Sequence, residues 1–245
     1  MKKIKIAALI PARFASTRLH AKLIQDLCGF SVIQTTFLSA QEIGIFDRII
    51  IATDHKTIQT QIVELGGEVF LSSQNHESGS DRIAEAAVDL DCDLIINIQG
   101  DEPFLDKETL LRLIEAFKSN DVQVASLMFE ISEEEAKNPN AVKVVFDHNY
   151  NALYFSRSLI PYDRDKKQNV KYWKHMGIYG YKKDFLLQFT KWEKSQLEKS
   201  EMLEQLRILE NGSKIRMVQT SHQAISIDTI QDLEQARNFL KNKRS

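Results

Sequence analysis

Short apolar runs alternate with amphipathic stretches through the first half of the chain. The runs at 49–51 and 94–96 are apolar without alternation, which is typical of parallel strands covered on both faces. Between the runs, apolar residues recur at helical spacing. We therefore expect strands at 4–10, 48–54, 68–72, 94–98 and 122–130, and helices at 31–43, 55–65, 80–90 and 107–119. This alternation predicts an α/β fold with a doubly wound, Rossmann-like sheet between helical layers.

The pattern changes after about residue 136. Two strand-like runs flank the turn sequence DHNY at 147–150, which indicates a β-hairpin. The remaining expected elements are strand-like runs at 171–183 and 214–220, helices at 182–189 and 198–210, and a last helix from Thr229. Gly212 would end the helix at 198–210, and Thr229 forms a capping-box pattern with Asp232. We interpret residues 1–245 as one domain with a β-rich insertion at about 136–181, whose exposed strands would serve for dimerisation.

The composition fits a globular protein that folds without disulfides. Of the 245 residues, 43% are hydrophobic and 27% charged, and the formal net charge of −2 gives no general basic surface for nucleic acid. The apolar runs are too short for a signal peptide or a membrane span, which favours a cytoplasmic protein without a membrane partner. Cys28 and Cys92 form no C-x-x-C pair and no zinc-type spacing, so we expect two small apolar side chains.

A cluster of cations follows the first expected strand. Arg13, Arg18 and Lys22 lie in the stretch IPARFASTRLHAK at 10–22, which contains no glycine. Ligands of open α/β sheets bind beyond the carboxyl ends of the strands, and side-chain cations can hold phosphate without a glycine-rich loop. The cluster therefore indicates an anionic ligand, although solvated loop charges alone would give the same pattern.

Carboxylates stand at two further expected strand ends. Asp101 follows the apolar run at 94–98, and Asp228 follows the short run AISI before the last helix. Across from a cation-lined loop, two such carboxylates suggest Mg²⁺ that bridges to phosphates. Each aspartate alone would also fit a turn residue or a charge that flanks a helix.

A third loop precedes the expected helix at 80–90. Ser78 and Gly79 stand where the first backbone N–H groups of a helix are free, and Arg82 follows within the first turn. These groups could contact the edge of a nucleobase, although an ordinary capped loop would have the same sequence.

Taken together, these segments resemble one enzyme family. The chain is similar, nearly from end to end, to the 3-deoxy-manno-octulosonate cytidylyltransferases, also called CMP-Kdo synthetases. The segments that carry the resemblance are IPARFASTR, SGSDRIAE, NIQGDEPFL, NPNAVKVVFD, ALYFSRSLIPYDRD, HMGIYGYKKDFL, EMLEQLRILENG and IDTIQDLEQAR. The runs ALYFSRSLIPYDRD and EMLEQLRIL are specific to this family rather than to cytidylyltransferases in general.

The resemblance implies a nucleotidyltransferase fold and a reaction in which CTP and Kdo, an acidic eight-carbon sugar, give CMP-Kdo and pyrophosphate. It also implies Mg²⁺ as cofactor, a homodimer and a role in lipopolysaccharide biosynthesis. By position, it assigns Arg13, Arg18 and Lys22 to the triphosphate, Ser78, Gly79, Arg82 and Gln99 to the rest of CTP, Asp101 and Asp228 to Mg²⁺, and Arg157, His175, Tyr179, Glu204 and Gln205 to Kdo. Lys22, Arg13, Asp101 and Asp228 would be the catalytic residues.

The residue types suit these roles. Arg157 and His175 are suitable partners for the carboxylate of Kdo, and Tyr179, Glu204 and Gln205 for its hydroxyls. By local pattern alone, each of these could equally be a core or solvated side chain. No G-x-S-x-G elbow or activated cysteine indicates a protein nucleophile, so we expect the anomeric hydroxyl of Kdo to attack the α-phosphorus directly.

The cation loop departs from the family pattern. Relatives usually read R-x-P-G-K-P after the serine-threonine pair, whereas this chain reads RLHAKL at 18–23 and lacks both prolines and the glycine. If the backbone at Ala21 must be left-handed, alanine costs roughly 1 kcal/mol there relative to glycine. This departure affects the expected affinity for the triphosphate more than the type of reaction.

Three alternatives stay open at the level of sequence. The acidic sugar could be a sialic acid, although the sister family that uses it lacks the ALYFSRSLIPYDRD run, or it could be the amino analogue of Kdo. From a different class, the chain could be a nucleotide-binding protein that has lost catalysis through the altered segment at 20–23.

Overall fold

The computed structural model describes residues 4–16, 19–74, 76, 78–165, 170–223 and 225–244. The chain divides into two compact units, each described here by itself. Unit 1 comprises residues 1–107, 182–190 and 224–245, and unit 2 comprises residues 108–181 and 191–223. The segment 136–181, predicted as an insertion, lies within unit 2.

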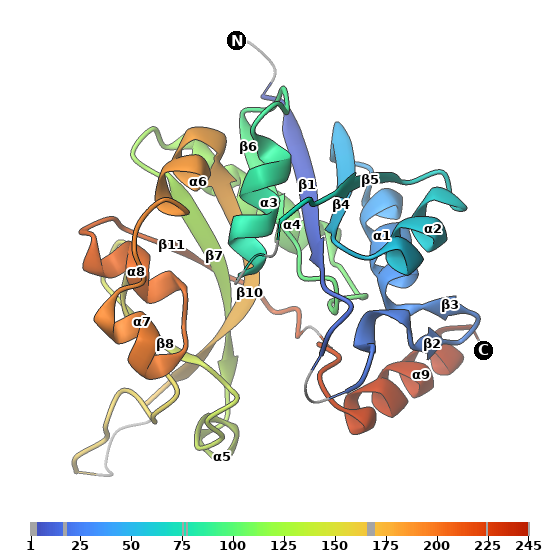
Figure 1. Ribbon diagram of the computed structural model, residues 1–245. Coiled ribbons are helices and arrows are strands. Elements are labelled where there is room, and N and C mark those ends of the chain that lie inside the picture. The colour runs from blue at the N-terminus through green and yellow to red at the C-terminus, as the bar shows by residue number, and fades with distance from the viewer. Residues whose placement is uncertain are drawn as a thin grey trace. The chain divides into compact units, whose positions relative to one another are not determined.

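Unit 1 is built on four parallel strands in the order β6-β1-β4-β5 (Figure 1). These strands are β1 (Ile6–Ala12), β4 (Arg48–Thr53), β5 (Glu68–Leu71) and β6 (Leu94–Asn97). In the central strand β1, residues 7–10 are at most 1% exposed. Burial on both faces explains why this strand is apolar at consecutive positions. The α/β fold with parallel strands that the sequence predicted is confirmed.

Most helices of unit 1 begin at a residue whose side chain caps them. The helices are α1 (Val32–Ile43), α2 (Lys56–Val63), α3 (Gly79–Ala87), α6 (Lys183–Phe189) and α9 (Ile230–Arg244), with a 3₁₀ turn, η1 (Lys22–Ile24). Ser31 and Gln34 form a capping box at the start of α1, and the Ser78 hydroxyl accepts from the backbone of Asp81 at the start of α3. The short hairpin of β2 (Asp26–Leu27) and β3 (Phe30–Ser31) was not predicted.

Unit 2 combines a mixed sheet with short helices. Its strand β7 (Val124–Ile131) pairs antiparallel with β10 (Tyr172–Lys182) and parallel with β11 (Arg216–Gln219). The predicted hairpin around DHNY is confirmed as β8 (Lys143–Phe146) and β9 (Ala152–Ser156). The other elements are α4 (Lys107–Glu115), which begins at the last residue of unit 1, η2 (Ala116–Lys118), α5 (Glu133–Ala136), α7 (Gln196–Glu201) and α8 (Gln205–Glu210).

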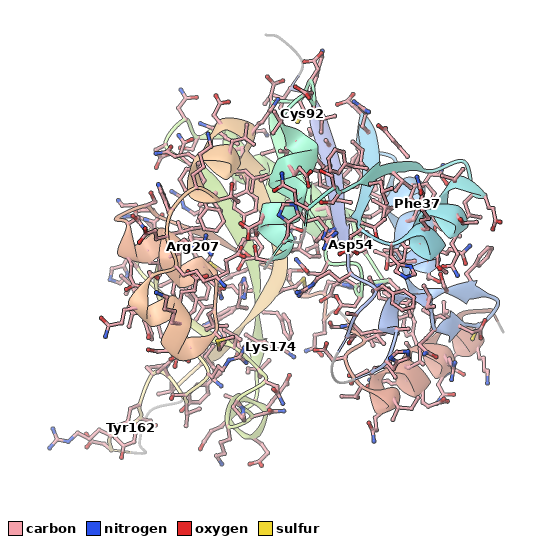
Figure 2. The ribbon with its side chains drawn as sticks, viewed as in Figure 1. Phe37, Asp54, Cys92, Tyr162, Lys174 and Arg207 are labelled. Carbon is pink, nitrogen blue, oxygen red and sulfur yellow. The ribbon has the colours of Figure 1, made fainter. Side chains whose placement is uncertain are left out.

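Two sequence predictions about elements are wrong. The single helix expected at 198–210 is two helices, because Met202 adopts a left-handed backbone with φ 53° and ends α7. A buried ion pair joins the two helices: Arg207 of α8 (Figure 2) donates at 2.7 and 2.6 Å to the two carboxylate oxygens of Glu198. The residues before Asp228, expected as a short strand, form no strand at 225–228.

In the part of the chain that the structure describes, no helix has the length and apolar character that a bilayer crossing requires.

Candidate active site

The cation loop leaves the carboxyl end of β1 and returns at η1. Arg13 lies just beyond β1 and is exposed, and Lys22 opens the 3₁₀ turn. Between them, Ala21 has φ 49° and ψ 40°, the left-handed conformation that the family pattern would fill with glycine. The chain thus keeps this backbone conformation with alanine in place. Arg18, predicted to help bind the triphosphate, lies outside the described residues.

Lys22 joins the two predicted metal ligands. Its ammonium group forms ion pairs with Asp101 and, at 2.8 Å, with Asp228. Burial alone would lower the pKa of Lys22, but the charges and hydrogen bonds of Asp101 and Asp228 outweigh it, so the pKa lies above its ordinary value. Lys22 is therefore a cation held between two carboxylates at the carboxyl end of the sheet.

Backbone contacts fix both aspartates in place. The backbone N–H of Ile227 donates to the Asp101 carbonyl at 3.0 Å, which ties the loop before α9 to the loop after β6. One carboxylate oxygen of Asp232 accepts hydrogen bonds from the backbone N–H groups of Asp228, at 3.0 Å, and Thr229, at 2.8 Å. The capping box predicted from the sequence is thus present, and it also holds the backbone of Asp228.

Gly100 owes its place to packing. A Cβ atom there would lie 3.0 Å from the Pro11 carbonyl oxygen and 3.1 and 3.2 Å from methyl groups of Leu23 and Ile33. The Gly100 carbonyl accepts a hydrogen bond from the Thr36 hydroxyl at 2.8 Å. The glycine therefore lets the chain pass close to β1 and brings Asp101 next to the cation loop.

A polar cavity of about 260 Å³ opens at this point within unit 1. It is lined by Pro11, Arg13, Ala15, Ser16, Lys22, Leu23, Gln99, Gly100, Asp101 and Asp228. Five residues that sequence analysis assigned to CTP or Mg²⁺ thus share one cavity: Arg13, Lys22, Gln99, Asp101 and Asp228. Gly79 lies beside this group, because a Cβ atom there would come within 3.3 Å of Pro11 and 3.9 Å of the Gln99 side chain.

Arg82 does not line the cavity. Its side chain is buried in α3 and donates to the Asp54 carboxylate (Figure 2) at 2.7 Å. Its Nε and Nη1 atoms have no hydrogen-bond partner among the described residues. The structure thus gives Arg82 a structural contact that the sequence did not suggest, and its contact with a nucleobase stays a prediction.

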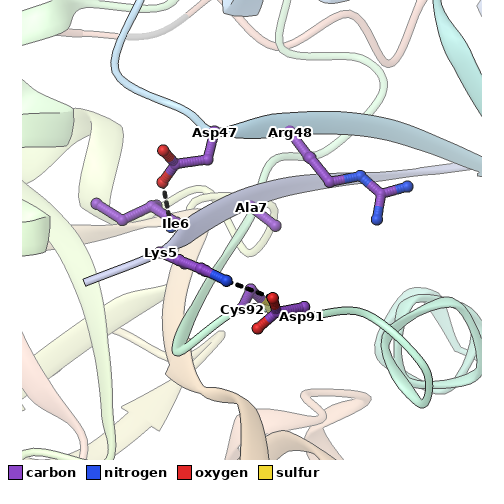
Figure 3. A pocket seen from close by; sticks show the side chains of 7 residues that line it. All are labelled: Lys5, Ile6, Ala7, Asp47, Arg48, Asp91 and Cys92. Atoms are coloured by element: carbon purple, nitrogen blue, oxygen red, sulfur yellow. Dashed lines mark hydrogen bonds and ion pairs between the residues drawn. The ribbon is translucent and has the colours of Figure 1, made fainter. Parts of the chain in front are cut away.

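A second cavity lies at the other end of β1, as Figure 3 shows, with a volume of about 350 Å³. An ion pair between Lys5 and Asp91 crosses it, and Asp47 accepts from the backbone of Ile6 at 2.9 Å. None of the predicted site residues lines this cavity.

The residues predicted to bind the sugar lie in unit 2. Arg157 donates from Nε to the Glu201 carbonyl at 2.8 Å, and its other nitrogens donate to the carbonyls of Pro139 and Met202 at 3.2 and 3.4 Å. These acceptors of the guanidinium group are neutral carbonyls near the end of α7, and the Glu201 carboxylate accepts from the Arg157 backbone N–H at 2.9 Å.

His175 is a neutral ring in this structure. Burial lowers the pKa of this imidazole to about 3, and its contact with the sugar stays a prediction. Its ring centroid lies 5.2 Å from that of Tyr179, which is 8% exposed. Burial, and then the charges of Tyr181 and Glu204, raise the pKa of the Tyr179 phenol. Glu204 precedes α8 and Gln205 is the first residue of this helix.

Comparison with known proteins identifies the family. Residues 7–215 match the Cytidylyltransferase family. The chain is 50% identical over 243 residues to the 3-deoxy-manno-octulosonate cytidylyltransferase of Flavobacterium johnsoniae, covering 98% of this chain and 100% of the relative. Identity to the enzyme of the same name from Fusobacterium nucleatum is 45% over 241 residues, with 97% and 98% covered. The chain belongs to the 3-deoxy-manno-octulosonate cytidylyltransferase family.

Solved structures agree with this assignment. A CMP:2-keto-3-deoxy-manno-octonic acid synthetase complexed with CTP is 34% identical and superimposes with a TM-score of 0.92 over 98% of this chain and 99% of the other. A 4-diphosphocytidyl-2C-methyl-D-erythritol synthase from Anaerococcus prevotii, 15% identical with a TM-score of 0.65 over 97% and 99% of the two chains, shares the fold. The resemblance that the sequence motifs carried is confirmed.

The carboxylates of Asp101 and Asp228 suit Mg²⁺ only if a bound nucleotide supplies further oxygen ligands. Among the described residues, no group of three or more His, Cys, Asp or Glu side chains is placed to hold a metal ion. Asp101 and Asp228 offer two carboxylates that converge on one point, the Lys22 ammonium. Mg²⁺ is often held by one or two carboxylates together with substrate phosphates and waters, so this pair fits the ion when a nucleotide is bound.

Proposed function

We propose that this chain transfers the cytidylyl group of CTP to 3-deoxy-manno-octulosonate, with release of pyrophosphate. The observation that carries the proposal is the convergence of Lys22, Asp101 and Asp228 in the cavity beyond β1. The match over nearly the full length to relatives named for this reaction, and to a synthetase structure that contains CTP, supports it.

In the proposed reaction, the anomeric hydroxyl of the sugar attacks the α-phosphorus and pyrophosphate leaves. Arg13 and Lys22 bind the phosphate oxygens and stabilise the charge that develops on the leaving group. Asp101 and Asp228 hold the pKa of Lys22 above its ordinary value, and bound phosphates, which are also anionic, would likewise favour its protonated form. Asp101 and Asp228 would hold Mg²⁺, which supplies Lewis-acid stabilisation when bound.

The second substrate is an acidic sugar, and unit 2 supplies the residues for it. Arg157 is the cation proposed for the carboxylate, and Tyr179, Glu204, Gln205 and the neutral ring of His175 are proposed for the hydroxyls. A role in lipopolysaccharide biosynthesis follows from a sugar of this kind. We also propose a homodimer formed through the β-rich segment of unit 2, and a cytoplasmic location, where CTP is available.

A coupled assay of pyrophosphate release tests the function. We expect release with CTP and Kdo, and little with UTP and Kdo. Sialic acid and the amino analogue of Kdo in place of Kdo distinguish the alternative sugars. Tight binding of CTP without release under any of these conditions would show a nucleotide-binding protein instead and contradict the proposal.

A further inference from the structure

Strand β10 has a bulge where it pairs with β7. Met176 lies opposite Leu127, but Tyr179, three residues further on, lies opposite Ser126, the direct neighbour of Leu127. Two residues of β10 are therefore extra at this point, which re-aims the side chains on either side. The Ser126 hydroxyl bridges the bulge, because its oxygen lies 3.2 Å from the Met176 carbonyl and 2.9 Å from the Ile178 carbonyl.

The same hydroxyl contacts His175. The distance from the Ser126 Oγ atom to Nε2 of His175 is 2.9 Å. Carbonyl oxygens only accept hydrogen bonds, so the single hydroxyl proton points to the carbonyls of Met176 and Ile178, and Oγ presents a lone pair to the imidazole. Nε2 must then carry the ring proton, and Nδ1 is the unprotonated acceptor.

The surroundings hold this ring in place and keep it neutral. The Phe155 ring packs edge-on against the His175 ring, with centroids 5.0 Å apart. The backbone N–H of His175 donates to the Val142 carbonyl at 2.9 Å. Burial lowers the pKa of His175 to about 3, so the ring stays neutral. Among the described residues, its Nδ1 atom makes no hydrogen bond.

We propose that Ser126 is a positioning residue for the sugar site: it fixes His175 as the Nε2–H tautomer, so that Nδ1 accepts a hydrogen bond from a hydroxyl of the acidic sugar. The proposal rests on the proposed function, because it names the chemical group that one residue of the site recognises. In this proposal His175 binds a sugar hydroxyl, and Arg157 binds the sugar carboxylate. Ser126 itself is fully buried and would not touch the substrate.

Nitrogen-15 NMR of the histidine side chains tests the tautomer in the full chain without substrate. The chain has six histidines, and a His175→Gln variant assigns the signals of His175. We expect protonated Nε2 and unprotonated Nδ1 in the wild type, and a shift of the Nδ1 signal when Kdo is added. A protonated Nδ1 in the wild type would overturn the proposal, whatever the activity of the enzyme.

Steady-state kinetics with Ser126→Ala tests the positioning. Loss of the hydroxyl lets His175 sample both tautomers, so we expect the KM for Kdo to rise about tenfold, the cost of roughly one hydrogen bond, with the KM for CTP changed less than twofold. Ser126→Thr keeps a hydroxyl and should recover much of the effect. Ser31→Ala, which removes a helix cap in unit 1, controls for a general loss of stability.

The outcomes separate this proposal from the proposed function. A wild-type enzyme that releases no pyrophosphate from CTP and Kdo contradicts the function, and a missing Nδ1 shift on addition of Kdo contradicts the sugar contact. An unchanged KM for Kdo in a folded Ser126→Ala variant, or an equal rise in Ser31→Ala, contradicts the positioning role. If Ser126→Ala does not fold, the KM for Kdo of Ser126→Cys and the tautomer of His175 in the wild type test the positioning role instead.

Discussion

The ammonium nitrogen of Lys22 lies 2.8 Å from a carboxylate oxygen of Asp228, although 206 positions separate the two residues in the chain. The same ammonium also binds Asp101, so one cation lies between two carboxylates and reduces their mutual repulsion. In the proposed function, a divalent ion shared by both aspartates would take the position that the ammonium now holds. Lys22 and Mg²⁺ would then compete for this position.

Removal of the lysine should strengthen binding of a divalent ion without nucleotide. In Lys22→Met the competing charge is gone, so we expect the Kd for Mn²⁺, measured by electron paramagnetic resonance of the free ion, to fall about tenfold. Lys5→Met is the matched control, since Lys5 pairs with Asp91 at the other end of β1. An equal Kd for wild type and Lys22→Met would contradict the shared position.

Asp101→Asn should abolish most of the activity and leave the stability nearly unchanged. The amide keeps the size of the side chain but removes the charge needed for Mg²⁺, which we expect to lower kcat by about a thousandfold, or about 4 kcal/mol. The melting temperature should change by only a few degrees. Asp91→Asn controls for loss of an aspartate near the sheet. Near-normal kcat at saturating Mg²⁺ would rule out the role of Asp101.

Ala21→Gly should stabilise the protein, which is unusual for a buried alanine. The left-handed backbone at φ 49° costs alanine roughly 1–2 kcal/mol, and glycine adopts it freely. The greater entropy of glycine in the unfolded chain takes back about 0.4–1 kcal/mol, so we expect a net gain of about 0.5–1 kcal/mol in the free energy of unfolding by urea. The control is Ala40→Gly, inside α1, which should lose about 1 kcal/mol. Equal losses in both variants would refute the strain at Ala21.

The sequence predicted elements wherever one segment determines its own structure. The capping box of Thr229 and Asp232 and the apolar pattern of β1 are of this kind. It could not predict the break at Met202, because this residue enters the left-handed region without a glycine to signal it. The buried pair of Glu198 and Arg207, which are nine positions apart, joins the two helices, and no local pattern reveals it.

The sequence predicted which residues form the site better than it predicted the contacts between them. The pattern at the strand ends pointed to Asp101 and Asp228, but nothing local indicated that Lys22 would bind both. Likewise, burial of Arg82 against Asp54 depends on tertiary packing, and no pattern within either segment reveals it. The neutral state of His175 follows from its burial, which no local pattern determines.

The acid dependence of stability should carry a contribution from His175. Its pKa of about 3 in the folded protein lies below its ordinary value of 6.5, so below pH 6.5 the unfolded chain binds a proton that the folded protein does not. The stabilising contribution is complete above pH 6.5 and is lost as the pH falls towards 3. Between pH 6.5 and pH 5 this loss is about 1.5 kcal/mol.

His175→Gln removes this proton. We expect the free energy of unfolding by urea, measured at pH 6.5 and pH 5, to fall less in the variant than in the wild type, by about 1.5 kcal/mol. The comparison uses the change with pH within each protein, so a general destabilisation by glutamine does not affect it. Parallel curves for the two proteins would mean that folded His175 takes up its proton between pH 6.5 and pH 5 as the unfolded chain does, and would contradict the lowered pKa.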